Sequence, residues 1–233
     1  MNRLFRFPLI LICSVCLLVL PAVAAAYSAP PPAVDAVSVA RSEIWKSITA
    51  GQDGSATIAI TDHGRLVYAE GFGVADRLQN IPVDKDTRFN IGSISKVYVT
   101  TAIMLLVDEA KVDLDKPVTA YLPEFRMADE RYRQITVRML LNHSSGLPGG
   151  SYANSFGFQY HQDFLPETLN TLAKSHLKHD PGAMAVYCND GFSLAEMIVE
   201  KVSGKKFAAF LQERVFTPLA LSRTGLGVGQ LPP

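Results

Sequence analysis

The segment that most constrains the fold of this chain is residues 93–110, which is apolar on nearly every side when it is read as a helix. Its apolar members are Ile94, Val97, Val99, Ala102, Ile103, Leu105, Leu106 and Val107. A helix that is apolar all round is stable only where other elements cover it. We therefore expect a buried helix here, inside a globular domain large enough to surround it.

The composition agrees with such a domain. Hydrophobic residues make up 48% of the 233 residues and charged residues 19%, which favours one globular domain with a sizeable core over a disordered chain. The 22 basic and 22 acidic residues give a formal charge of zero. Residues 1–26 carry two arginines and no acid, so the rest of the chain has a charge of 20 − 22 = −2. This balance does not favour binding to nucleic acid or to anionic lipid.

The N-terminus has the layout of a secretory signal peptide. Arg3 and Arg6 precede an apolar run at residues 8–20 and a small-residue stretch at residues 22–26. The run is too short to span a bilayer. We assign residues 1–26 as a signal peptide, with no membrane span after cleavage, and expect an exported protein that is periplasmic or secreted.

The expected layout after cleavage is a short linker, residues 27–35, and a single catalytic domain, residues 36–233. Cleavage removes two of the three cysteines and leaves Cys188. One thiol cannot form an internal disulfide, so the stability of the domain in an oxidising compartment must come from its core.

Periodic and turn-forming patterns predict the other elements. Apolar residues at helical spacing predict a helix at residues 36–49. Two apolar stretches around a turn-forming run at residues 61–64 predict an antiparallel hairpin. No sustained period is present at residues 74–90, which predicts an irregular connection. The hairpin strands are expected at residues 56–60 and 65–70, later helices at residues 137–142, 194–202 and 207–215, and a loop at residues 143–152.

The first candidates for chemistry are Ser93 and Lys96, which are three residues apart and so share one face of a helix. An ordinary serine is a poor nucleophile. A lysine in apolar surroundings is costly to keep charged, so we expect the pKa of Lys96 to fall and its amine to accept the proton of Ser93. At a helix start the backbone N–H of Ser93 has no intrahelical acceptor. It can therefore donate to the oxyanion that forms when Ser93 attacks a carbonyl.

The same spacing occurs twice more, at residues 175–178 and 203–206, so it is weak evidence on its own. Ser203 falls at a helix end, and Ser175 lies on a polar stretch, so neither is expected to hold a lysine in apolar surroundings. Ser93 alone opens the apolar helix. The alternative for this pair is an N-capping serine beside a lysine whose amine reaches solvent.

Several motifs together resemble the serine β-lactamases and the related penicillin-binding proteins, peptidases and esterases, most closely the class C type. Residues 89–96 are similar to the nucleophile segment of that family, and residues 140–147 to its helix-to-loop signature. Pro181 and Gly182 lead to residues 187–189, which resemble its second catalytic motif. The match runs from the hairpin almost to the end of the chain. Several motifs in this order are far more specific than any one of them.

The resemblance implies an α/β (α+β) fold of the β-lactamase/transpeptidase-like type, with an antiparallel sheet flanked by helices and a mainly helical region. It implies a serine hydrolase that forms an acyl-enzyme on β-lactam, D-alanyl peptide or small ester substrates, without a cofactor. The expected partner is a small-molecule or peptidoglycan-derived substrate.

The resemblance also implies roles for single residues. Ser93 is the nucleophile, and Lys96 and Tyr187 share its proton, which Tyr187 later gives to the leaving group. Asn189 hydrogen-bonds the substrate amide. The less favoured alternative for the last two is a buried tyrosine and a turn asparagine, because both types are common in loops.

The other reactive residue types are expected to be structural. Cys188 has no base at a useful spacing and is expected to pack in the core. His143 is expected to brace a loop, since the chain has no Gly-x-Ser-x-Gly segment for a serine–histidine triad. His176 and His179 have no third ligand nearby in sequence, so we expect no metal site. Residues 152–154 repeat the Tyr-x-Asn spacing, but no Pro-Gly pair precedes them.

One part of the family pattern is not found. A Lys-Thr-Gly or His-x-Gly motif, which such domains carry on a strand near the C-terminus, does not occur. Residues 223–225 imitate it where we expect a turn. We therefore expect this C-terminally truncated chain to hold the front of the domain, with the last strands and one oxyanion donor missing. The alternative to an active hydrolase is a catalytically inactive, cell-wall-binding relative or a truncated fragment.

Overall fold

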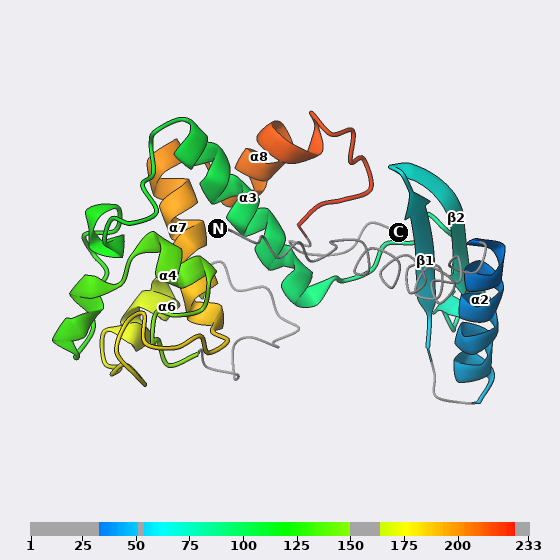
Figure 1. Cartoon of the computed structure of the whole chain (residues 1–233), viewed down its shortest axis with the longest axis horizontal. Helices are drawn as coiled ribbons and strands as arrows, with labels where there is room; N and C mark the ends of the chain where they lie inside the picture. The colour runs from blue at the N-terminus through cyan, green and yellow to red at the C-terminus, as the bar shows by residue number, and fades with distance from the viewer. Residues whose placement is uncertain (1–32, 51–53, 150–163, 227–233) are drawn as a thin grey trace, which may run out of the picture. The chain divides into compact units, whose positions relative to one another are not determined.

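A computed structural model of the chain shows two compact units, Met1–Thr87 and Arg88–Pro233. The first holds an antiparallel hairpin with a helix along it, and the second is almost entirely helical (Figure 1). The expected signal peptide at residues 1–26 and most of the expected linker at residues 27–35 lie outside the described residues. The structure describes residues 33–50, 54–149 and 164–226.

The hairpin of the first unit consists of β1 (Ala56–Asp62) and β2 (Arg65–Phe72). The strands pair antiparallel, with Ile58 opposite Glu70. The prediction of a hairpin is confirmed, and each strand runs two residues further than expected. The connection is therefore a tight loop of two residues, His63 and Gly64, which is the commonest way to join antiparallel strands.

Helix α2 (Ala33–Thr49) lies along this hairpin, as its apolar spacing predicts. The rings of Trp45 and Phe72 meet edge to face with their centroids 5.4 Å apart. Phe72 is only 1% exposed, so this contact is the buried part of the interface. An ion pair of 2.9 Å between Arg41 and Glu70 adds a polar contact at its margin.

Two short strands, β3 (Val74–Asp76) and β4 (Ile81–Pro82), pair antiparallel where we expected an irregular connection. That prediction was wrong. The Asp76 carboxylate accepts hydrogen bonds from the backbone N–H groups of Leu78 and Gln79, at 2.8 and 3.0 Å, which close the turn between the strands. A turn made by one side chain leaves no periodic apolar pattern in the sequence.

The second unit is organised around α3 (Ser95–Asp108), which packs against α7 (Asn189–Ser203). The prediction that the α3 segment is buried on every side was wrong. Val97 is 62% exposed and Ile94, just before the helix, 61% exposed. The buried face consists of Val99, Ala102, Ile103 and Leu106.

Helix α7 is the other half of this core, and its buried apolar residues include Leu194, Ala195, Ile198 and Val199. It begins five residues earlier than expected. Helices α4 (Val137–Leu141) and α6 (Phe164–Leu172) pack against it, of which only α4 was predicted. Figure 1 shows α4 and α6 close to the start of α7. The segments that precede α7 in the chain thus lie at the N-terminal end of that helix.

The remaining elements connect these helices. The predicted helix at residues 207–215 is confirmed as α8 (Phe207–Leu211), which continues into a π-helical turn, η4 (Gln212–Phe216). A turn is present at residues 222–223, closed by Thr224 N–H donating to Leu221 O at 3.3 Å, so it overlaps the expected turn at residues 223–225 only at its start. Among the described helices, none has the length and apolar character needed to cross a bilayer. Two 3₁₀ turns, η2 (Val118–Ala120) and η3 (Glu130–Gln134), precede α4.

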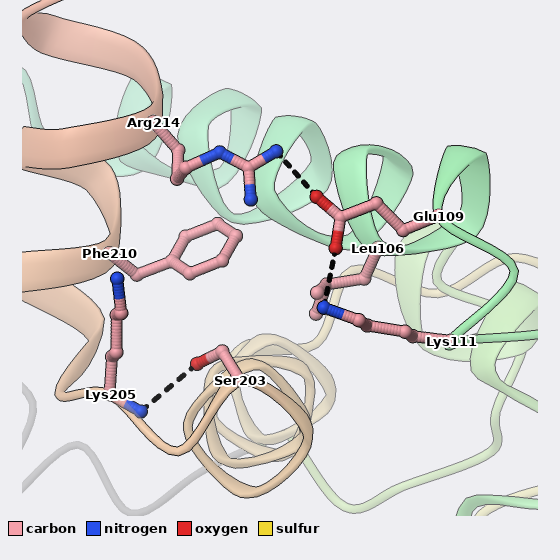
Figure 2. A pocket seen from close by; sticks show the side chains of 7 residues that line it. All are labelled: Leu106, Glu109, Lys111, Ser203, Lys205, Phe210 and Arg214. Carbon is pink, nitrogen blue, oxygen red and sulfur yellow. Dashed lines mark hydrogen bonds and ion pairs between the residues drawn. The ribbon is translucent and has the colours of Figure 1, made fainter.

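A depression of about 100 Å³ lies between the C-terminal end of α3 and the α8–η4 segment (Figure 2). Leu106 and Phe210 provide its apolar lining. The Glu109 carboxylate accepts a hydrogen bond from Arg214 and pairs with Lys111 at 2.8 Å. The Arg214–Glu109 pair joins η4 to the end of α3, roughly 25 Å along the helix from Ser93.

Candidate active site

Ser93 lies in a short 3₁₀ turn, η1 (Gly92–Ile94), directly before α3. The Asn90 side chain accepts a hydrogen bond from Gly92 N–H at 2.8 Å, which fixes the chain as it enters this turn. Ser93 is exposed, so its hydroxyl is accessible. Because backbone N–H groups in a first helical turn have no intrahelical acceptor, the N–H of Ser93 is suited to bind an oxygen of a ligand.

The amine of Lys96 lies on the same face of the helix start as Ser93. Its Nζ donates hydrogen bonds to Ser93 Oγ at 3.2 Å and to Asn189 Oδ1 at 2.8 Å. The rings of Tyr187 and Phe192 have their centroids 4.7 and 5.5 Å from this nitrogen. Lys96 is half-buried, so the apolar surroundings that the sequence predicts are present on one side only.

Tyr187 adds a second hydroxyl to this pair. Its Oη lies 2.5 Å from Ser93 Oγ, and the residue is 55% exposed, so both hydroxyls can be reached from solvent. Desolvation by itself raises the pKa of Tyr187. Its hydrogen bonding with Lys96 and Ser93 and the charge of Lys96 outweigh this effect and bring the pKa below its ordinary value. A proton can therefore pass along a connected chain of three polar groups.

Asn189 joins this chain from the first position of α7. The next residue, Asp190, is buried and accepts a hydrogen bond from Gly149 N–H at 3.0 Å. The start of α7 therefore holds the Lys96 amine and the loop after α4 at the same time. The four side chains that the structure brings together, which we call the Ser93 cluster, are Ser93, Lys96, Tyr187 and Asn189.

Two further residues shape the segment before α7. Cys188 is 2% exposed, and burial raises the pKa of its thiol, in agreement with the expected packing role. His143 accepts a hydrogen bond from Cys188 N–H on its Nδ1, at 3.1 Å. The sequence predicts a loop-bracing histidine but not its hydrogen bond to Cys188, because 45 residues separate the two partners.

The other serines with the same spacing have structural contacts. Ser175 Oγ donates to Thr171 O at 2.8 Å, and Ser203 Oγ accepts from Lys205 N–H at 3.2 Å. The Tyr-x-Asn repeat at residues 152–154 lies outside the described residues. In the part of the chain that the structure describes, no three histidine, cysteine or acidic side chains gather as metal ligands.

A family model described as Beta-lactamase matches residues 45–232, which include the whole Ser93 cluster. The chain belongs to the β-lactamase family. Among its relatives, esterase EstB of Burkholderia gladioli is 32% identical over 182 residues, which cover 73% of this chain and 46% of the esterase. Penicillin-binding protein 4 of Amycolatopsis lactamdurans is 34% identical over 153 residues, 65% of this chain and 39% of the relative.

Solved structures show the same family resemblance. The D-amino acid amidase of Ochrobactrum anthropi SV3, in complex with L-phenylalanine amide, matches with a TM-score of 0.68 at 29% identity. The match covers 79% of this chain and 50% of the amidase. This β-lactamase-family chain thus has the β-lactamase/transpeptidase-like fold that its motifs predict, and it spans about half or less of the length of these relatives.

Proposed function

We propose that this β-lactamase-family protein is a serine hydrolase that forms an acyl-enzyme on Ser93. The observation that carries the proposal is the position of Ser93 Oγ, 2.5 Å from Tyr187 Oη and 3.2 Å from Lys96 Nζ. A hydroxyl becomes an effective nucleophile when a positioned base takes its proton, and both neighbours lie within reach. The proposed substrates are β-lactams, D-alanyl peptides or small esters.

In the acylation step, Ser93 Oγ bonds to the carbonyl carbon of the substrate. The Ser93 proton passes to the Lys96–Tyr187 pair, in which the amine and the phenol together hold one proton fewer than their full number. The carbonyl oxygen becomes an oxyanion, which accepts a hydrogen bond from Ser93 N–H at the helix start. The C–N or C–O bond to the leaving group then breaks, and Tyr187 supplies the proton that the departing nitrogen or oxygen needs.

Asn189 has a binding role in this proposal. Its Oδ1 accepts from Lys96, which leaves the amide nitrogen to donate to a carbonyl of the substrate. In the second half of the reaction, water loses a proton to the Lys96–Tyr187 pair and attacks the Ser93 ester. The acid product leaves, and the proton returns to Ser93 Oγ.

We also propose that the protein is exported to the periplasm or secreted, with residues 1–26 removed as a signal peptide. The support is the order of Arg3, Arg6, an apolar run and small residues. The expected cleavage is after Ala24 or Ala26. N-terminal sequencing of protein recovered from the periplasm tests this assignment, and a chain that still begins at Met1 would contradict it.

Hydrolysis of nitrocefin, p-nitrophenyl acetate and a D-alanyl-D-alanine peptide by the full-length protein tests the proposed activity. One relative is named a penicillin-binding protein and another an esterase, so β-lactams and esters come first. Ser93→Ala should abolish turnover, and Ser203→Ala, which has the same Ser-x-x-Lys spacing, should leave it unchanged. Turnover that survives in Ser93→Ala contradicts the proposal. Absence of turnover with every substrate favours the alternative, a catalytically inactive, cell-wall-binding relative or a truncated fragment.

A further inference from the structure

Three contacts connect His143 to Tyr187. The His143 carbonyl oxygen accepts a hydrogen bond from Val186 N–H at 2.9 Å, and its Nδ1 accepts one from Cys188 N–H at 3.1 Å. The backbone N–H groups of the two residues that flank Tyr187 are thus bonded to a single residue. The imidazole also lies against the Tyr187 ring, with centroids 4.7 Å apart and an angle of 36° between the planes. Because more than half of Tyr187 is exposed, these contacts have a large share in orienting it.

His143 is itself held in place. It follows α4 directly, and its backbone has a left-handed φ of 63°. Its N–H donates to Leu140 O at 3.4 Å, and its ring packs against Phe192 of α7 with centroids 5.1 Å apart. The imidazole is therefore held between α4 and α7, and its contacts can hold Tyr187 in a defined position.

The geometry defines the charge state of this imidazole. A backbone N–H can only donate, so the Nδ1 that receives the Cys188 bond carries no proton, and a neutral ring has its hydrogen on Nε2. Burial lowers the pKa of His143 below the ordinary 6.5, and the charge of Lys96 lowers it further.

The ionisable groups that face the ring come from three directions. They are the Lys96 amine on α3, whose charge acts on the imidazole, the Tyr187 phenol, whose ring lies against it, and Cys188 before α7, whose backbone N–H bonds to its Nδ1. Asp190, on the first turn of α7, directs a carboxylate oxygen to Gly149 N–H. The positive charge of Lys96 therefore opposes a second positive charge on the imidazole.

We propose that neutral His143 is a positioning residue that holds Tyr187 Oη on Ser93, and that protonation of His143 releases Tyr187 and stops turnover at acidic pH. The inference rests on the proposed function of the Ser93 cluster. A proton on Nδ1 would remove the acceptor of Cys188 N–H and set two donors against each other. It would also place a positive charge beside Lys96. Both changes displace residues 186–188 from the nucleophile.

Rates measured against pH for the full-length protein and two variants test the catalytic part. In His143→Asn the amide oxygen can replace Nδ1 as acceptor, does not titrate, and asparagine tolerates a left-handed φ. His143→Ala removes the acceptor and the ring. The wild-type rate should fall about tenfold per pH unit below a midpoint under 6.5. The asparagine variant should lose this decline and stay within about tenfold of the wild type at neutral pH.

The alanine variant separates positioning from binding. It should lose roughly 10²-fold in kcat with little change in KM, because Tyr187 is misplaced while the substrate contacts remain. Thermal unfolding of each variant shows whether it is folded. An acidic decline that persists unchanged in His143→Asn would assign that decline to another group, such as the Lys96–Tyr187 pair. That result, or full activity of a folded His143→Ala protein, would overturn the inference.

Nitrogen-15 NMR provides a readout that does not depend on turnover. The chain has five histidines, and the signals lost in His143→Asn identify those of His143. We expect the imidazole of His143 to be the Nε2–H tautomer and to titrate with a midpoint below pH 6.5. With fluorotyrosine in place of Tyr187, the fluorine signal should shift with the same midpoint, and only when His143 is present. The Nδ1–H tautomer or an unresponsive fluorine signal would overturn the inference. Loss of the proposed function would appear separately, as the absence of Ser93-dependent hydrolysis.

Discussion

At the scale of single residues, Lys96 has a role that its charge alone does not explain. Its Nζ is 3.2 Å from Ser93 Oγ and 2.8 Å from Asn189 Oδ1, so one nitrogen contacts both the proposed nucleophile and a proposed substrate-binding residue. A residue that only neutralised charge could be exchanged for another cation. A residue that takes and returns a proton could not.

Lys96→Arg separates these roles, because arginine keeps the positive charge but does not lose its proton in proteins. We expect acylation of Ser93 to slow by about 10²–10⁴-fold, the range typical of a lost general base. Rapid-mixing kinetics with a chromogenic β-lactam or ester measure this rate. Lys206→Arg is the matched control, since Lys206 has the same spacing from Ser203. Acylation at the wild-type rate in Lys96→Arg would rule out Lys96 as the base.

The sequence predicts part of the Ser93 cluster and not the rest, for a physical reason. Ser93 and Lys96 are one helical turn apart, so their spacing predicts a contact. Tyr187 is 94 residues away from Ser93 in sequence, and only the packing of α7 against α3 brings it there. Family resemblance, not local spacing, identified Tyr187 and Asn189. Neither family resemblance nor local spacing predicted the contacts of His143 with this segment.

At the scale of elements, the loop after α4 depends on a close approach of two backbones. Gly146 has a φ of +77°, and a Cβ there would lie 2.4 Å from His179 O. Lys178 N–H also donates to Gly146 O at 2.8 Å. Gly204, at the C-terminal end of α7, has a similar φ of +69° but open space around it. The two glycines thus differ in crowding and not in conformation.

Gly146→Ala and Gly204→Ala form a matched pair for this loop. Gly204→Ala should lower the free energy of unfolding by about 1 kcal/mol, the cost of a left-handed residue with a side chain. Gly146→Ala adds the displacement of the facing backbone and should cost at least about 3 kcal/mol. Denaturant titration of both variants measures the difference. If both variants lost the same free energy of unfolding, the crowding at Gly146 would contribute nothing to the cost of the substitution.

Glu196 of α7 makes the stability of the helical part depend on pH. Burial raises the pKa of Glu196 to about 7, and the charge of Glu200, one turn later, raises it as well. Glu200 is held by a hydrogen bond from Phe207 N–H at 2.9 Å and an ion pair with Lys206 at 3.3 Å. The folded pKa exceeds the 4.5 of an ordinary glutamate. The stabilisation by the bound proton is therefore complete below pH 4.5 and is lost as the pH rises through 7.

Glu196→Gln imitates the protonated side chain at every pH. We expect the variant to be more stable than the wild type at about pH 8, by at most about 3 kcal/mol, with the difference shrinking towards about pH 5. Denaturant unfolding at several pH values measures this. Glu124→Gln, at an exposed position paired with Lys201 at 3.6 Å, should show no such pH dependence. A Glu196→Gln protein whose stability tracks that of the wild type at every pH would contradict the assignment.

Elements were predictable where their pattern is local. Helix α2 and the β1–β2 hairpin follow from apolar spacing and a turn-forming run. The β3–β4 pair was not predicted because Asp76 makes its turn through one side chain. The exposure of Val97 was not predicted because composition alone does not tell which face of an apolar helix its neighbours cover.

At the scale of the whole molecule, the family match covers residues 45–232 and so extends over parts of both compact units. Every member of the Ser93 cluster belongs to the unit Arg88–Pro233. The helical unit thus holds the proposed nucleophile, the proposed base and the helix-start N–H. The account therefore depends most on whether this serine reacts covalently.

Covalent labelling tests that claim most directly. The full-length protein is incubated with a fluorescent penicillin or a fluorophosphonate, digested and analysed by mass spectrometry. We expect one adduct, on Ser93, with the mass of the intact penicillin because the β-lactam ring opens without losing a group. Labelling should be lost in Ser93→Ala and kept in Ser175→Ala and Ser203→Ala. An adduct on Ser175 or Ser203, or undiminished labelling of Ser93→Ala, would contradict the account.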